Sequence, residues 1–157
     1  MFDAQRLELA EPAFDVGAAL RLMEQEFAPW VRDFGLVIES IETARPTGAL
    51  PDWQPGAVLR LPFSPSICRD GVTVCGQALT ALADAAMLLA CSAAWNRYQP
   101  MTPVDQTMHF LRPVDFDVVA DSRVVRIGRS TSFGRVMLYS AADKRPVGMV
   151  ASAYRTH

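Results

Sequence analysis

A long apolar segment, residues 76–95, dominates the pattern of hydrophobic and polar positions along this chain. Its side chains are apolar nearly all round a helix, which is typical of a helix enclosed by other structure. Asp84 is the only charged residue between positions 78 and 94. Gln77, Thr80 and Asp84 follow one another at spacings of three and four, so an amide, a hydroxyl and a carboxylate share one helix face.

The same segment is long enough to be compared with a membrane span. Its many alanines and its central carboxylate argue against that interpretation, because alanine anchors weakly in lipid and an ionised group is costly there. Residues 1–15 lack a basic region followed by an apolar core, so we expect no secretory signal. The pattern favours a cytoplasmic protein with no membrane partner.

Residues 15–31 show the pattern of an amphipathic helix, with Asp15 as its cap and Pro29 limiting its end. One face of this helix would carry Leu20, Met23, Phe27 and Trp30. Two predicted strands follow, "FGLVIESIE" and "AVLRLPFS". The segment between them, "RPTGALPDWQPG", is rich in turn residues.

Four extended segments follow the buried helix: "TPVDQTMHFLRPV", "DVVADSRVVRIG", "TSFGRVMLYSAA" and "RPVGMVASAYRT". Short hairpin connections join the last three, and we expect the four to form an antiparallel meander. The order of elements predicts a single α+β domain over residues 1–157, in which a curved antiparallel sheet wraps a central long helix, with an additional N-terminal helix. An exposed sheet edge would also favour self-association.

Composition narrows the class of protein. Hydrophobic residues make up 50% of the chain and charged residues 20%, and the formal charge of −2 gives no reason to expect a nucleic-acid partner. Lys144 is the only lysine among 15 basic residues; arginine suits phosphate contacts, although exposed strand faces explain the bias equally well. We expect no metal or other cofactor, since the cysteines fit no zinc spacing and favour a reduced setting: Cys68, Cys75 and Cys91.

Four stretches together, "CGQALTALADAA", "HFLRPV", "RVVRIGRSTSF" and "ASAYRT", resemble the hotdog-fold acyl-CoA thioesterases of the phenylacetic-acid (PaaI-like) group. The similarity runs over about residues 69–155. It implies a hotdog fold and an acyl-CoA substrate. It also implies a homodimer or homotetramer whose active sites lie between subunits.

The resemblance assigns roles by position. Asp84 matches the catalytic acid, and Gly76 matches a glycine whose backbone N–H polarises the thioester carbonyl. Cys75 and Gln77 stand where the family usually has a histidine and a second glycine. Arg69 falls where several members have an asparagine that helps to hold a nucleophilic water.

Further candidates for substrate binding are less clear-cut. A polar family position on the next strand falls on Pro103, with Thr102 beside it. Thr80 and Gln77 either position water or the acyl group, or satisfy one another. Cys75 fits a small packing residue better than a nucleophile, because no histidine is placed to act as its base. Two arginines near the predicted hairpin are candidates for the CoA phosphates, though solvent exposure explains them equally well: Arg126 and Arg129.

The chemistry of this segment can be argued from the residues themselves. Thioester hydrolysis needs an activated water or carboxylate and donors for the developing oxyanion. A helix N-terminus supplies unpaired N–H groups, and Gly76 permits close approach to them. Asp84 lies roughly 12 Å further along the helix, too far for both groups of one chain to hold the same atom, so we predict a composite site between two subunits.

Three functions compete on this evidence. The first is a thioesterase for a small or medium-chain acyl-CoA, with Asp84 as the working group. The second is a binding protein of the same fold that holds an acyl-CoA or another acyl ligand without turnover, since the Cys75-Gly76-Gln77 triplet departs from the family pattern. A dehydratase of this fold would need a histidine, and the helix region has none, so we set it aside.

Overall fold

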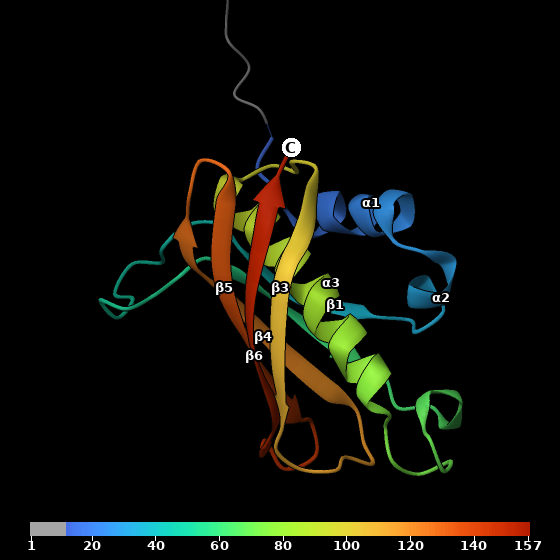
Figure 1. The fold of residues 1–157 in the computed structure, drawn as a ribbon. Helices are drawn as coiled ribbons and strands as arrows, with labels where there is room; N and C mark the ends of the chain where they lie inside the picture. Colours follow the sequence, from blue (N-terminus) through green and yellow to red (C-terminus); the bar gives the residue numbers. More distant parts are fainter. Residues whose placement is uncertain (1–11) are drawn as a thin grey trace, which may run out of the picture.

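The computed structural model describes residues 12–157, which form one antiparallel sheet wrapped around one long helix (Figure 1). Helices α1 (Val16–Glu26) and α2 (Pro29–Arg32) precede strands β1 (Val37–Glu42) and β2 (Gly56–Leu61). A 3-10 turn, η1 (Pro65–Ile67), leads to helix α3 (Gly76–Trp95). The remaining strands are β3 (Met101–Phe110), β4 (Val118–Ile127), β5 (Thr131–Ser140) and β6 (Pro146–Thr156). The predicted α+β class is confirmed; that residues 1–157 form a single domain stays a prediction, since 1–11 lie outside the described residues.

Helix α3 is the centre of the hydrophobic core, as its sequence predicts. Leu82, Met87 and Leu89 on this helix are fully buried. Close approach of helix and sheet depends on Gly134 of β5, where an added Cβ would lie 2.0 Å from the Met87 side chain. By length and composition α3 could cross a membrane, but 67% of its apolar window is buried inside the protein. It is therefore the core helix of this fold.

The strand order differs from the predicted meander. The sheet runs β1-β2-β4-β5-β6-β3, so of the four strands predicted to form the meander only β4, β5 and β6 are consecutive neighbours. β3 pairs with β6, from Met101 opposite Thr156 to Phe110 opposite Gly148, and not with β4. The segment between β3 and β4 therefore crosses to the other side of β5 and β6. This leaves β3 at one edge of the sheet, beside α3 (Figure 1).

The N-terminal helix is shorter than predicted. Asp15 caps α1 as expected, accepting a hydrogen bond from the Ala18 N–H at 2.8 Å. Phe27 then adopts an extended conformation and ends the helix, and Pro29 begins α2 instead of closing α1. The predicted apolar face is also wrong in part, because Leu20 is 48% exposed, while the buried side chains of α1 are Ala19, Leu22 and Met23.

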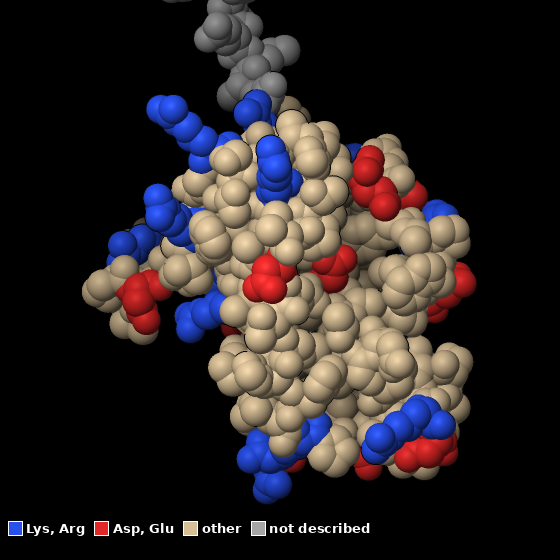
Figure 2. Space-filling view, viewed as in Figure 1, with Lys and Arg blue, Asp and Glu red and all other residues tan. Residues whose placement is uncertain are grey.

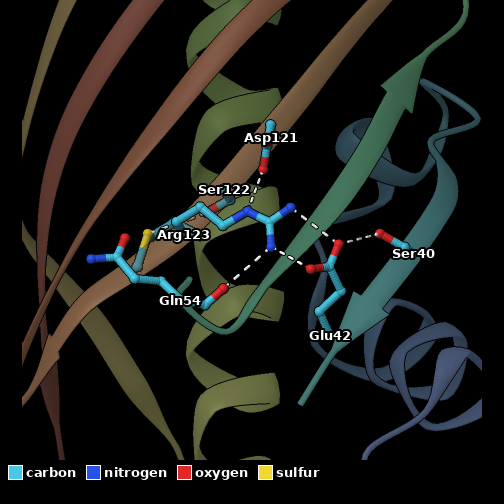
Figure 3. A network of polar contacts seen from close by, with 7 residues as sticks. Ser40, Glu42, Gln54, Asp121, Ser122 and Arg123 are labelled. Carbon is cyan, nitrogen blue, oxygen red and sulfur yellow. Dashed lines mark hydrogen bonds and ion pairs between the residues drawn. The ribbon is translucent and has the colours of Figure 1, made fainter. Parts of the chain in front are cut away.

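A group of ion pairs joins strands that are distant in sequence (Figure 3). Arg123 on β4 donates through Nη2 to Oε1 of Glu42 at 3.1 Å and through Nη1 to Oε2. The same guanidinium donates to Asp121 at 2.6 Å and to the Gln54 carbonyl at 3.2 Å. Each of the three guanidinium nitrogens of Arg123 thus has an acceptor. These bonds tie the end of β1 to β4.

Candidate active site

A pocket of about 900 Å³ lies between α3, β3 and the α1–α2 segment. Figure 2 shows that this face is hollowed between the lobe of α1 and α2 and the rest of the molecule, with acidic side chains near the middle and most basic ones toward the borders. Two of the lining residues carry charge, both of them acids: Glu26 and Asp84. The remaining lining residues are Phe27, Ala28, Trp30, Val31, Gly76, Gln77, Thr80, Ala81, Ala85, Leu88, Pro103, Gln106 and Phe110.

The three polar residues that the sequence places on one helix face, Gln77, Thr80 and Asp84, all line this pocket. The i, i+3 and i, i+4 spacing brings them to one side of α3, as predicted. That side faces β3 and the α1–α2 segment, whereas the opposite side of α3 packs on the sheet. The single carboxylate of the apolar helix therefore stands at the surface of a pocket and not within the packed core.

Asp84 has a single hydrogen-bonding side chain as its partner among the described residues. The O–H of Tyr154 on β6 donates a short hydrogen bond to Oδ1 of Asp84. It also lies 3.3 Å from the Asp84 backbone carbonyl oxygen. Oδ2 accepts no hydrogen bond from the described part of the chain, and no cation pairs with the carboxylate there. One oxygen is thus fixed, and the other is available to a ligand.

Tyr154 is the functional candidate that sequence reasoning missed. It is 1% exposed and belongs to a strand whose neighbours at this level are Pro103 of β3 and Ser132 of β5. Burial and the nearby Asp84 carboxylate raise the pKa of the Tyr154 hydroxyl. It therefore stays protonated and acts as a donor. The alternation of β6 signals an inward-facing tyrosine, but no local pattern indicates a partner 70 residues away.

The N-terminus of α3 forms the second polar part of the pocket. Gly76 and Gln77 line it. Cys75 is the N-cap residue, but its side chain makes no capping hydrogen bond. The Cys75 N–H donates a hydrogen bond to the Ile67 carbonyl at 2.9 Å. The ring of Phe110 lies so close to Gly76 that an added Cβ would meet it at 3.1 Å, so a larger residue at this position would push against the ring.

Thr80 is held by its own helix. Its hydroxyl donates to the Gly76 carbonyl at 2.8 Å and lies 3.3 Å from Met108 Sδ. The Gln106 side chain on β3 donates to the Thr80 carbonyl at 3.2 Å and ties the edge strand to the helix. Among the described residues Thr80 and Gln77 do not bond each other. The proton of Thr80 is therefore committed, while its methyl group and the Gln77 side chain remain for a ligand.

The other candidates from the sequence do not line the pocket. Arg69 is exposed on the loop before α3, and its N–H donates to the Thr73 carbonyl at 3.1 Å. Thr102 is exposed and lies 2.9 Å from the His157 ring. Two arginines, at the end of β4 and in the turn after it, lie at the other end of the sheet from the start of α3: Arg126 and Arg129.

The pattern of elements and the pocket define an α+β protein with a carboxylate and a helix N-terminus around an apolar cavity. Residues 73–147 match the model of the thioesterase superfamily. No curated protein is similar enough in sequence to be matched with this chain.

Solved structures of similar fold span nearly the whole described chain. A conserved protein of Pseudomonas aeruginosa has a TM-score of 0.71 and 23% identity over 85% of this chain and 98% of its own. The E. coli PaaI protein from the phenylacetic acid degradation operon has a TM-score of 0.71 and 18% identity over 90% and 92%. Zebra fish thioesterase superfamily member 2 has a TM-score of 0.70 and 16% identity over 90% and 94%.

These similarities confirm the resemblance drawn from the sequence. The fold is the hotdog fold of the PaaI-like proteins. Residues 73–147 are similar to the thioesterase superfamily, and this similarity supports thioester hydrolysis as the general activity.

Proposed function

We propose that this protein hydrolyses the thioester of a small or medium-chain acyl-CoA to the free acid and CoA. The observation that carries the proposal is the pocket itself, in which Asp84 and the Gly76–Gln77 helix start face a mainly apolar lining. An apolar lining suits the acyl group, and its two acidic residues would repel an acyl group that carries a carboxylate.

In one form of the proposed reaction, Oδ2 of Asp84 takes a proton from a water molecule whose oxygen attacks the carbonyl carbon; the C–O bond forms, the C–S bond breaks, and the proton passes to the leaving sulfur of CoA. In the other form, Oδ2 attacks the carbonyl carbon itself and the CoA thiolate leaves and takes a proton from water. The acyl anhydride on Asp84 is then hydrolysed by a water molecule to the free acid. The N–H groups at Gly76 and Gln77 donate to the carbonyl oxygen as it becomes negative. Cys75 packs at the start of this helix, and its N–H donates to the Ile67 carbonyl, so the side chain has a packing role in this proposal.

Two copies of the chain would bring these groups together. Asp84 and Gly76 of one chain are roughly 12 Å apart along α3. β3 pairs with β6 on one side, and its other side meets no strand among residues 12–157. Exposed apolar side chains along this edge include Val104 at 63% and Phe110 at 58%. We propose a homodimer or homotetramer, assembled along β3, with Asp84 of one chain facing Gly76 of the other.

The remaining candidates fit the outside of such a site. Arg69 lies on the loop that leads into α3, so it is placed to meet a water or a phosphate near the helix start. Thr102, Arg126 and Arg129 lie far from Gly76 in the same chain, and would contact CoA only from a second copy. A cytoplasmic location, where acyl-CoA is available, completes the proposal.

The test is the release of free thiol from a panel of straight-chain and branched acyl-CoAs. Wild type should show turnover, and Asp84→Asn should lose about 100- to 10 000-fold in kcat. The Asn side chain keeps an oxygen that accepts from Tyr154, so folding should be unaffected. Asp143→Asn, which changes an exposed carboxylate in the β5–β6 turn, is the matched control. Equal rates in wild type and Asp84→Asn would exclude this mechanism.

A binding protein of the same fold is the second candidate. The observation that favours it is the packing of Phe110 against Gly76, which narrows the approach to the helix N–H groups. In that case wild type would bind acyl-CoA in calorimetry without releasing thiol. Phe110→Ala would then open the approach, and a gain of hydrolysis in this variant would show that the ring blocks turnover.

A further inference from the structure

Asp84 and Tyr154 form a hydrogen-bonded pair across the wall of the pocket. Tyr154 comes from the inner face of β6 and reaches Asp84 on α3, 70 residues earlier in the chain. Its hydroxyl contacts both a carboxylate oxygen and the backbone carbonyl of the same residue. A donor that contacts both atoms restricts rotation of the carboxylate about its own side-chain bonds.

We propose that Tyr154 is a positioning residue for thioester hydrolysis, which holds Oδ1 of Asp84 so that Oδ2 faces the pocket. The inference rests on the proposed function. Tyr154 does not line the pocket, so it acts through Asp84 and not on the substrate. A carboxylate held in one orientation reacts faster than one that rotates freely, because less disorder must be lost on reaching the reactive geometry.

Among the described residues, Tyr154 is the side chain that hydrogen-bonds to the Asp84 carboxylate. Cys91 of α3 lies nearby, and burial raises the pKa of its thiol to about 12, so it stays neutral. At this level β3 and β5 contribute Pro103 and Ser132, which do not titrate. Glu26 is the other titratable group on the pocket wall.

The pocket offers an internal comparison. Glu26 also accepts a hydrogen bond from a tyrosine, since the Tyr98 hydroxyl donates to Oε2 at 3.2 Å. That pair is exposed, and it joins the end of α1 to the segment after α3. The pair at Asp84 differs because its tyrosine is fully buried. Burial fixes the phenol ring, and a fixed donor is what positioning requires.

Tyr154→Phe tests the proposal, since it removes only the hydroxyl and keeps the ring. We expect kcat to fall on the order of 10- to 100-fold, with KM for acyl-CoA little changed. A purely structural role of Tyr154 would not lower kcat while KM and the thermal stability stay close to those of wild type.

Tyr139→Phe is the matched control. Tyr139 is half-buried on β5, and its hydroxyl makes no hydrogen bond among the described residues. Turnover by wild type with an unchanged kcat in Tyr154→Phe overturns this inference alone. Absence of turnover in wild type overturns the proposed function, and this inference with it.

Discussion

Two carboxylates of this protein, Glu42 and Asp84, sit in opposite surroundings. Glu42 lies at the end of β1 and receives two hydrogen bonds from the Arg123 guanidinium and one from Ser40 at 3.2 Å (Figure 3). Asp84 receives hydrogen bonds from one neutral donor, Tyr154, and one of its oxygens has no partner among the described residues. The first carboxylate is neutralised by a cation, whereas the second is not.

The different partners of Glu42 and Asp84 distinguish a carboxylate with a structural role from one that can react. The Arg123 hydrogen bonds lower the pKa of Glu42, and a carboxylate so engaged is a poor base and has no free oxygen to offer a substrate. Asp84 keeps an oxygen toward an apolar pocket where no cation competes for it. Whether a carboxylate of this protein has a structural or a chemical role is therefore judged from its hydrogen-bond partners and not from its burial.

The largest expected effect comes from changing each acid in turn. Asp84→Asn should reduce kcat for acyl-CoA hydrolysis by about 100- to 10 000-fold, whereas Glu42→Gln should leave kcat within about twofold of wild type. The measurement is steady-state thiol release at neutral pH for both variants. A large loss of kcat in Glu42→Gln, with the protein still folded, would break the comparison.

The second prediction concerns the space beside Asp84. Ala81 lies one turn before Asp84 and lines the pocket, so Ala81→Leu should fill volume that we assign to the acyl group. We expect kcat/KM for the longest acyl-CoA accepted to fall by roughly 10- to 100-fold, with a smaller effect on the shortest.

The control for this prediction is Ala151→Leu, which places the same side chain on the exposed face of β6. Rates for a series of chain lengths, measured on both variants, give the result. An equal loss for every chain length in Ala81→Leu would show that the acyl group lies elsewhere.

The two carboxylates also mark how far the sequence can be interpreted. The polar line on α3 was predictable, because its spacing is local and its surroundings are apolar. The partners of both acids were not, since Glu42 and Arg123 are 81 residues apart and Asp84 and Tyr154 are 70 apart. The position of β3 beside β6 was missed for the same reason, as strand pairing depends on the whole sheet and not on the pattern within one strand.

The break between α1 and α2 was missed for another reason. Phe27, Ala28 and Trp30 continue the helical pattern of apolar residues, and that pattern predicts one helix. In the structure these side chains line the pocket, and the chain leaves helical geometry at Phe27. Two of these residues, Ala28 and Trp30, are exposed at the pocket wall and not buried along a helix face, and the sequence pattern does not distinguish the two arrangements.

The third prediction concerns stability and pH. Glu42 has a lowered pKa in the folded protein, mainly because Arg123 donates to it. Its contribution to stability is therefore present above about pH 4.5, the ordinary value, and is lost as the pH falls through the lower folded value. The free energy of unfolding of Glu42→Gln should be about 1–2 kcal/mol lower than that of wild type near neutral pH. The difference is modest because the ion pair is partly exposed. The loss should shrink in acid.

Urea unfolding of wild type and Glu42→Gln between pH 3 and pH 7 measures this effect. A constant difference between wild type and Glu42→Gln across this pH range would show that the ion pair with Arg123 is not the source of the stability.

The smallest expected effect compares two helix starts. Asp15 caps α1 through its side chain, whereas Cys75 leaves the first N–H groups of α3 without a side-chain acceptor. Cys75→Ser would supply a side-chain acceptor at a residue whose backbone conformation suits an N-cap. The free energy of unfolding should therefore rise by about 0.5–1 kcal/mol, which corresponds to about 1–4 °C in Tm. Asp15→Ala should lose a similar amount. If Cys75→Ser instead lowers Tm, packing of the thiol contributes more to stability than a cap would. The uncapped N–H groups at the start of α3 would then cost the protein no stability.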